Sequence, residues 1–105
     1  MRRVAAGFLL LVLVSWTATS AQKKKHSVTL KWEAPLGLVG ASIVGYSVYR
    51  SDKENGDYKL IAKNIRSLSY TDVAVQSGHT YYYKVTSVDS TGRESTAAKS
   101  KATVP

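Results

Sequence analysis

Short runs in which every second residue is apolar alternate along the chain with polar runs rich in Gly, Asn, Asp and Ser. In the clearest run, Val28, Leu30 and Trp32 alternate with Thr29 and Lys31. Successive side chains of a strand point to opposite faces, so this period of two predicts half-buried strands. After the first 21 residues, no stretch shows the 3.6-residue period of an amphipathic helix.

Six strands are predicted in this way, at 28–32, 43–50, 58–62, 67–72, 81–88 and 94–104. Turn-forming residues separate them. Asn55-Gly56 between the second and third strands favours a hairpin turn with positive φ. Short strands with turns every 8–12 residues indicate an all-β sandwich.

The tyrosine triplet near residue 82 divides by parity. Tyr81 and Tyr83 share the face that Val85 continues, so we expect them to point inward. Tyr82 shares the opposite face with Lys84, which leaves it available to a partner.

The N-terminus has the pattern of an export signal. Two arginines precede an apolar run at 4–16, and small and polar residues follow at 17–21. This order predicts a signal peptide over 1–21, cleaved after Ser20 or Ala21, and a secreted, periplasmic or extracellular protein that meets the membrane only transiently. The alternative is a retained anchor, but a spanning helix needs about 20 mostly apolar residues and hydroxyl side chains dilute this run.

The predicted mature chain has room for one small domain. Cleavage after residue 21 leaves 84 of the 105 residues, of which 22–27 form a flexible basic lead-in and 28–105 the domain. The chain contains no cysteine, which excludes disulfides, thiolate metal sites and thiol catalysis. We therefore expect the stability to come from packing.

The chain is basic. Its formal net charge is +8, and loss of the two N-terminal arginines would leave +6. Lys23, Lys24 and Lys25 supply half of that excess, and the remaining lysines are scattered along the sequence. The run Lys23–Lys25 is interpreted as a solubilising tail just past the cleavage site. An anionic surface polymer or phospholipid headgroups are the alternative partners, whereas export argues against nucleic acid.

Four landmarks in order resemble the fibronectin type III family, in its bacterial branch. They are Trp32, the segment Ile43-Val44-Gly45-Tyr46-Ser47-Val48, the segment Tyr70-Thr71-Asp72, and the segment from Gly78-His79-Thr80-Tyr81 to Gly92. The resemblance implies an immunoglobulin-like β-sandwich of six to seven strands. The residues before Val28 lack alternation, so the first strand is expected to be short or missing, which leaves a sheet edge open to a partner strand.

The resemblance also implies structural roles for four aromatic residues. Tyr81 is expected to be the tyrosine-corner residue, with its hydroxyl bonded to the backbone near 75–77. Trp32 is expected in the core against Tyr46 and Tyr83.

No arrangement of residues points to catalysis. The two histidines, His26 and His79, are not accompanied by a recognisable nucleophile turn. Asp52, Glu54 and Asp57 share a loop, but their spacing does not fit a twelve-residue calcium loop. We expect no enzyme activity, no metal and no cofactor.

The leading interpretation is a non-catalytic interaction or spacer module of the cell envelope that binds a protein partner through loops or an exposed sheet edge. The candidate loop contacts are Leu36, Leu38 and Val39 in one apolar loop and Arg93 in the loop 89–93. For the apolar loop the other interpretation is that Leu38 or Val39 folds under and caps one end of the core. The alternative is an accessory domain that binds carbohydrate or an anionic polymer. It would use the outward aromatic residues Tyr49, Tyr58 and Tyr82 with the lysines.

Overall fold

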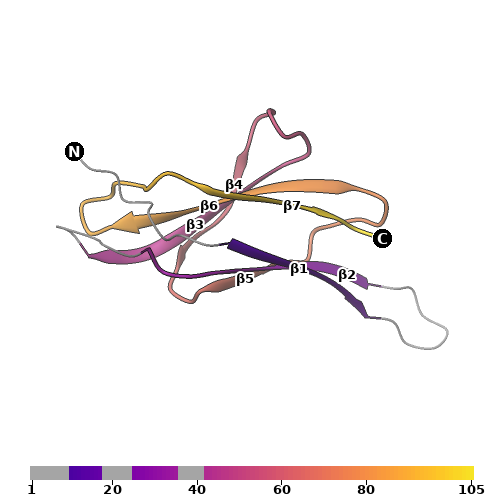
Figure 1. The fold of residues 1–105 in the computed structure, drawn as a ribbon, viewed down its shortest axis with the longest axis horizontal. Coiled ribbons are helices and arrows are strands. Elements are labelled where there is room, and N and C mark those ends of the chain that lie inside the picture. The colour runs from indigo at the N-terminus through magenta and orange to yellow at the C-terminus, as the bar shows by residue number, and fades with distance from the viewer. Residues whose placement is uncertain (1–9, 18–24, 36–41) are drawn as a thin grey trace.

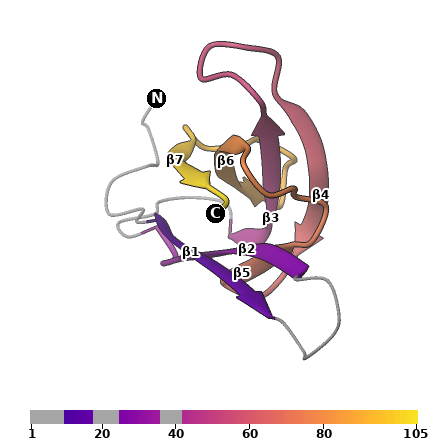
Figure 2. The same cartoon turned by 90° about the vertical axis from the view of Figure 1, so that its right-hand side faces the viewer.

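Two antiparallel sheets face each other in the computed structural model, which describes residues 10–17, 25–35 and 42–105 (Figures 1 and 2). The first sheet has the order β1-β2-β5, formed by β1 (Leu10–Thr17), β2 (Lys25–Trp32) and β5 (Ser69–Asp72). The second has the order β4-β3-β6-β7, formed by β3 (Ile43–Ser51), β4 (Lys59–Ile65), β6 (Thr80–Asp89) and β7 (Ala98–Thr103). The predicted all-β sandwich is confirmed. Nowhere in these three ranges is there a helix long and apolar enough to cross a membrane.

The core lies between the two sheets, because alternate residues of each strand point inward. Val28, Leu30 and Trp32 of β2 are almost fully buried. The Trp32 and Tyr46 rings lie 5.4 Å apart at a tilted angle. The remaining buried apolar residues come from β3, from β6 and from β7 with the residue that follows it: Tyr46, Val48, Tyr81, Tyr83, Val85, Ala102 and Val104.

The first strand of the sandwich is present in the full chain. β1 pairs antiparallel with β2, with Val12 opposite Leu30 and Val14 opposite Val28. Leu10, Val12 and Val14 pack against the core. This corrects the expectation of a short or missing first strand. Leu10, Val12 and Val14 are every second residue of the apolar run in the predicted leader. This run can therefore form the first strand and bury one face against the core.

The predicted flexible lead-in is partly ordered for the same reason. β2 begins at Lys25 rather than Val28, because Lys25 and Ser27 pair with Thr17 and Ser15 of β1. The Ser15 and Ser27 hydroxyls are 3.1 Å apart on the outer side of this sheet. Residues 1–9 and 18–24, including the predicted cleavage sites after Ser20 and Ala21, lie outside the described residues.

The turn predicted at Asn55-Gly56 needs correction. Among the described residues the positive φ angles belong to Asn64, Gly78 and Gly92, and Gly56 is not one of them. The β3–β4 connection is too long for a two-residue hairpin turn, and it contains a β-turn over 53–56 with a 3.1 Å hydrogen bond from the Gly56 N–H to the Lys53 carbonyl.

Strand bounds also differ from the predicted ones. β4 extends to Ile65, beyond the predicted end at residue 62. The last strand begins at Ala98 rather than at residue 94, because Glu94 forms only an isolated bridge with Val88.

Candidate functional site

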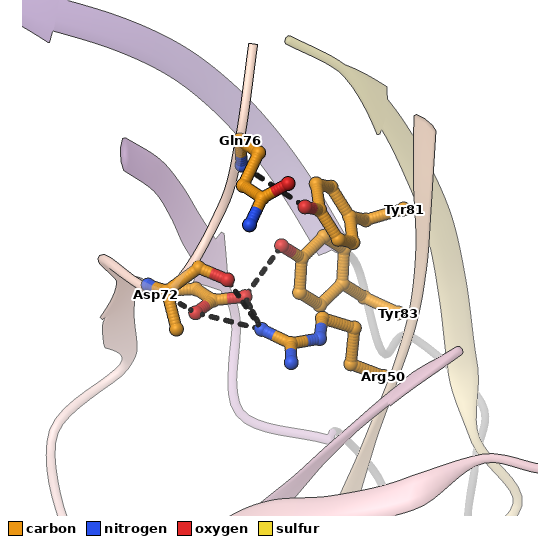
Figure 3. A network of polar contacts seen from close by, with 6 residues as sticks. Arg50, Asp72, Gln76, Tyr81 and Tyr83 are labelled. Atoms are coloured by element: carbon orange, nitrogen blue, oxygen red, sulfur yellow. Dashed lines mark hydrogen bonds and ion pairs between the residues drawn. The ribbon is translucent and has the colours of Figure 1, made fainter. Parts of the chain in front are cut away.

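A buried polar network joins the two sheets around Asp72 (Figure 3). The Asp72 carboxylate accepts hydrogen bonds from Arg50 Nη1 at 2.8 and 3.1 Å and from the Tyr83 hydroxyl at 2.7 Å. It also accepts the Ala74 N–H at 3.1 Å. Only 4% of the Asp72 side chain is exposed, so these bonds replace the water that a buried carboxylate loses.

Tyr81 and Arg50 extend this network. The Tyr81 hydroxyl accepts a 2.9 Å hydrogen bond from the Gln76 N–H, within the segment implied by the tyrosine corner. The Arg50 guanidinium lies 5.3 Å from the centre of the Tyr81 ring and donates to the Ala74 carbonyl at 3.2 Å. The network thus connects the end of β5 to β3 and β6.

The electrostatics of the network suit a structural role. Burial raises the pKa of Tyr83, and the hydrogen bond to Asp72 adds to this effect. Burial opposes the charge of Arg50, but the hydrogen bond and charge of Asp72 raise the pKa of Arg50 overall. A tyrosine whose pKa is raised does not exchange protons near neutral pH, so this arrangement supports the sandwich rather than acid–base chemistry.

The outer face of the four-stranded sheet gathers a second group, which we call the tyrosine–lysine face: Tyr49, Tyr58, Tyr82, Lys84, Lys99 and Lys101. Directly paired residues of antiparallel strands share a face. Tyr49 pairs with Lys84, which pairs on its other side with Lys99. In the next row along the strands, Tyr82 pairs with Lys101.

Lys84 is held against an aromatic ring. Its Nζ lies 4.1 Å from the centre of the Tyr58 ring, which is the geometry of a cation–π contact. The Tyr58 hydroxyl donates a 2.8 Å hydrogen bond to the Glu54 carbonyl, which orients the ring. Burial and then the charge of Glu54 raise the pKa of Tyr58, so its hydroxyl stays neutral at physiological pH.

Glu94 holds the side chain of Tyr49 in place. Its carboxylate accepts the Tyr49 hydroxyl at 2.8 and 3.0 Å and the Thr86 hydroxyl at 2.7 Å. Burial, followed by the hydrogen bond and charge of Glu94, raises the pKa of Tyr49. Among the described residues the Tyr82 hydroxyl has no hydrogen-bond partner, so it is the most available polar group of the three tyrosines.

Lys84, Lys99 and Lys101 are separated in the sequence but lie together on this face of the folded sheet. This corrects the interpretation that the lysines outside 23–25 are scattered. Lys84 lies directly opposite Lys99, and within the described ranges neither they nor Lys101 form an ion pair. Like charges directly opposite each other in a sheet destabilise it. The face therefore gathers three lysines without an ion pair among the described residues, and Glu94, which binds the Tyr49 hydroxyl, places a negative charge beside them.

The loop 89–93 is closed by its own acidic residue. Asp89 accepts hydrogen bonds from the Thr91 hydroxyl and N–H and from the Arg93 N–H. The Thr91 hydroxyl, these N–H groups and the Arg93 charge lower the pKa of Asp89 to about 2. The Arg93 side chain is 71% exposed, so it is accessible to a partner.

The other expectations concern the apolar loop, a metal site and the histidines. Leu36, Leu38 and Val39 lie outside the described residues. Across the described ranges no three His, Asp or Glu side chains are placed to hold a metal ion. The exposed His79 stacks on the Tyr81 ring with centres 6.1 Å apart.

Comparison with known proteins identifies the fold family. No family model matches the chain. The crystal structure of a Fn3-like protein from Clostridium thermocellum is 34% identical, matches 88% of each chain and superposes with a TM-score of 0.64. The chain belongs to the fibronectin type III family. Fibronectin type III domains are typically non-catalytic modules.

Two further relatives are enzymes of which this fibronectin type III domain matches only a small part. An amylopullulanase from Thermoanaerobacter thermohydrosulfuricus is 40% identical over 90 residues, which is 80% of this chain and 6% of the enzyme. A β-1,2-glucanase from Parabacteroides distasonis is 30% identical over 75% of this chain and 11% of the enzyme, with a TM-score of 0.61. The similarity therefore concerns a module within these enzymes.

Proposed function

We propose that this domain is an exported, non-catalytic accessory module that binds a negatively charged polysaccharide through the tyrosine–lysine face. The observation that carries the proposal is the row Tyr49–Lys84–Lys99, which places two lysines without an ion pair among the described residues beside aromatic rings. Sugar rings stack on aromatic side chains, and acidic groups of the polymer would pair with the lysines.

The arrangement of the face favours an extended anionic ligand over a small molecule. The lysines lie on two neighbouring strands, with Lys99 and Lys101 two residues apart, which corresponds to roughly 7 Å along β7. A charged polymer lying across these strands would neutralise the repulsion between Lys84 and Lys99. The face is an exposed sheet surface, which a chain-like ligand can follow without entering a cavity.

The comparisons support a carbohydrate context. Two of the relatives are named for enzymes that act on polysaccharides, and the similarity lies in a small part of each. The N-terminal pattern of basic, apolar and small residues supports export to a compartment where such polymers occur.

Affinity electrophoresis tests the proposal directly. Migration of the purified protein is compared in gels containing polygalacturonate, heparin, pullulan or amylopectin. The two acidic polymers are expected to retard the protein, and the retardation is expected to weaken as salt rises. Tyr82→Ala and the double variant Lys99→Glu/Lys101→Glu are each expected to weaken binding at least tenfold.

Lys31→Glu is the matched control, because Lys31 is an exposed lysine on β2 in the other sheet. Its change of charge equals that of Lys99→Glu alone and is half that of the double variant, and it is expected to leave most of the binding intact. An equal loss of binding in Lys31→Glu would show that binding depends on the net charge of the protein and not on the tyrosine–lysine face. Retardation by neutral pullulan alone, or by no polymer, would overturn the proposal.

A further inference from the structure

The segment Leu10–Thr17 is predicted to be removed with the leader, yet it forms a strand of the folded domain. Residues 10–17 lie within the predicted leader, and they also form β1 of the sandwich. We infer that the outer edge of β2 is an acceptor site for an extended strand of another polypeptide, which Leu10–Thr17 fills in the full chain and leaves when the leader is removed. This inference concerns the three-stranded sheet and is independent of the tyrosine–lysine face.

The site is defined by the contacts of β1. β1 pairs with β2 over eight residues and also lies against β7 of the opposite sheet (Figure 2). Its inward side chains Leu10, Val12 and Val14 pack against the core. Removal of β1 therefore opens both a row of backbone hydrogen-bonding groups and an apolar space beside Val28 and Leu30.

An empty site of this kind is unfavourable for the domain. The unpaired N–H and C=O groups of an edge strand are a template for another strand. The chain has no disulfides to compensate for lost packing, and only 84 residues would remain after cleavage. Strand addition restores the hydrogen bonds and the apolar cover in one step.

The structure also specifies the chemistry of the incoming strand. It must run antiparallel to β2 and place apolar side chains where Leu10, Val12 and Val14 now lie. Small polar residues suit the alternate positions, because Ser15 faces the Ser27 hydroxyl. An acidic residue at the C-terminal end would lie beside Lys25, which is opposite Thr17.

A second copy of this domain does not meet these requirements. Pairing of two β2 edges would supply hydrogen bonds, but Val28, Leu30 and Trp32 of each copy are already buried in their own core. They cannot also fill the space of Leu10, Val12 and Val14 in the other copy. The occupant we infer is therefore a strand without a core of its own, such as a terminal segment of a partner protein.

Displacement of β1 within the full chain tests the inference. Val12→Asp/Val14→Asp places charges at inward positions, whereas the control Leu13→Asp changes an outward side chain that is 51% exposed. The probe is a fluorescent peptide with the sequence of residues 10–17 between solubilising lysines. We expect it to bind Val12→Asp/Val14→Asp at least tenfold more tightly than Leu13→Asp or the unmodified chain. A version with proline at the positions of Val12 and Val14 should not bind.

Cleavage in place provides the second arm. A specific protease site introduced at residues 18–22 allows the folded full chain to be cut and the β1 fragment to be removed. Loss of the fragment is expected to lower the melting temperature by about 10 °C or more, or to unfold the domain, and the peptide is expected to reverse either change.

The outcomes of the two arms are distinct. Peptide binding to the displaced variant together with recovery of the cut domain would support the inference. Failure of the peptide to bind or restore either form would overturn it. A stable dimer of the cut domain that excludes the peptide would also overturn it, in favour of a second copy.

Discussion

The Tyr83 hydroxyl donates a 2.7 Å hydrogen bond to the buried Asp72 carboxylate, and this bond joins β6 of one sheet to the end of β5 in the other. Arg50 from β3 binds the same carboxylate at 2.8 Å. Three strands thus meet at one acidic side chain. The position of the short strand β5 over the four-stranded sheet depends on this contact as well as on apolar packing.

Removing either partner of this bond is expected to destabilise the domain by different amounts. Tyr83→Phe removes one hydrogen bond and should lower the free energy of unfolding by about 1–2 kcal/mol. Asp72→Asn also leaves the Arg50 charge without its carboxylate and should cost about 2–4 kcal/mol. Urea unfolding of both single variants and the double variant measures the coupling. Strict additivity of the two changes would contradict a shared network.

The raised pKa of Tyr83 predicts a loss of stability at alkaline pH. A tyrosine ionises from a neutral form, and the native state holds that form beyond the ordinary pKa of 10.0. Its contribution to stability is therefore complete below about pH 10 and falls as the pH rises above it, because only the unfolded state then releases this proton. Ultraviolet titration should show one fewer late-ionising tyrosine in Tyr83→Phe. An unchanged late phase would assign that phase to another tyrosine.

The lowered pKa of Asp89 predicts a loss of stability at acidic pH. Its pKa is lowered from 3.8 to about 2 in the native state, so its contribution is present above its ordinary pKa and is lost as the pH falls toward 2. The carboxyl carbon signal of Asp89 should titrate near pH 2 in a carbon-13 NMR experiment. Asp89→Asn should flatten the acid limb of the stability profile. Titration near 3.8 would show that the loop 89–93 does not hold the carboxylate in solution.

Lys99→Glu is expected to separate stability from binding. It replaces the repulsion between Lys84 and Lys99 with attraction, and should stabilise the domain by about 0.2–1 kcal/mol. The same change should weaken binding of an acidic polysaccharide, because it removes a cation from the tyrosine–lysine face. Thermal unfolding and affinity electrophoresis on the same preparation compare the two effects. Reduced stability in Lys99→Glu would show that the lysine pair is compensated.

The sandwich could be predicted from sequence because strand alternation, turn residues and family landmarks agree along the chain. β1 could not be assigned, since a continuous apolar run satisfies a leader and a strand equally well. The Arg50–Asp72 pair was missed, although Arg50 has the parity of the inward residues Tyr46 and Val48, and a charge at such a position indicates a buried partner.

The tyrosine–lysine face was only partly predictable. Parity places Tyr82 and Lys84 on one face, but the approach of Lys99 depends on the register between β6 and β7. That register is set by the apolar pattern of both strands together with the geometry of their connection, and the predicted last strand began at residue 94 rather than at Ala98. The contacts proposed for Leu36, Leu38 and Val39 stay predictions.

The most direct test of the account is an NMR titration of the nitrogen-15-labelled protein with polygalacturonate oligomers. We predict that the largest amide shift changes occur on β3, β6 and β7, around Tyr49, Tyr82 and Lys99, and that they weaken as salt is raised. Amides of β2 and β5 should change little. Changes confined to the loops or to the three-stranded sheet, or no changes at millimolar ligand, would contradict the assignment of the tyrosine–lysine face as the binding surface.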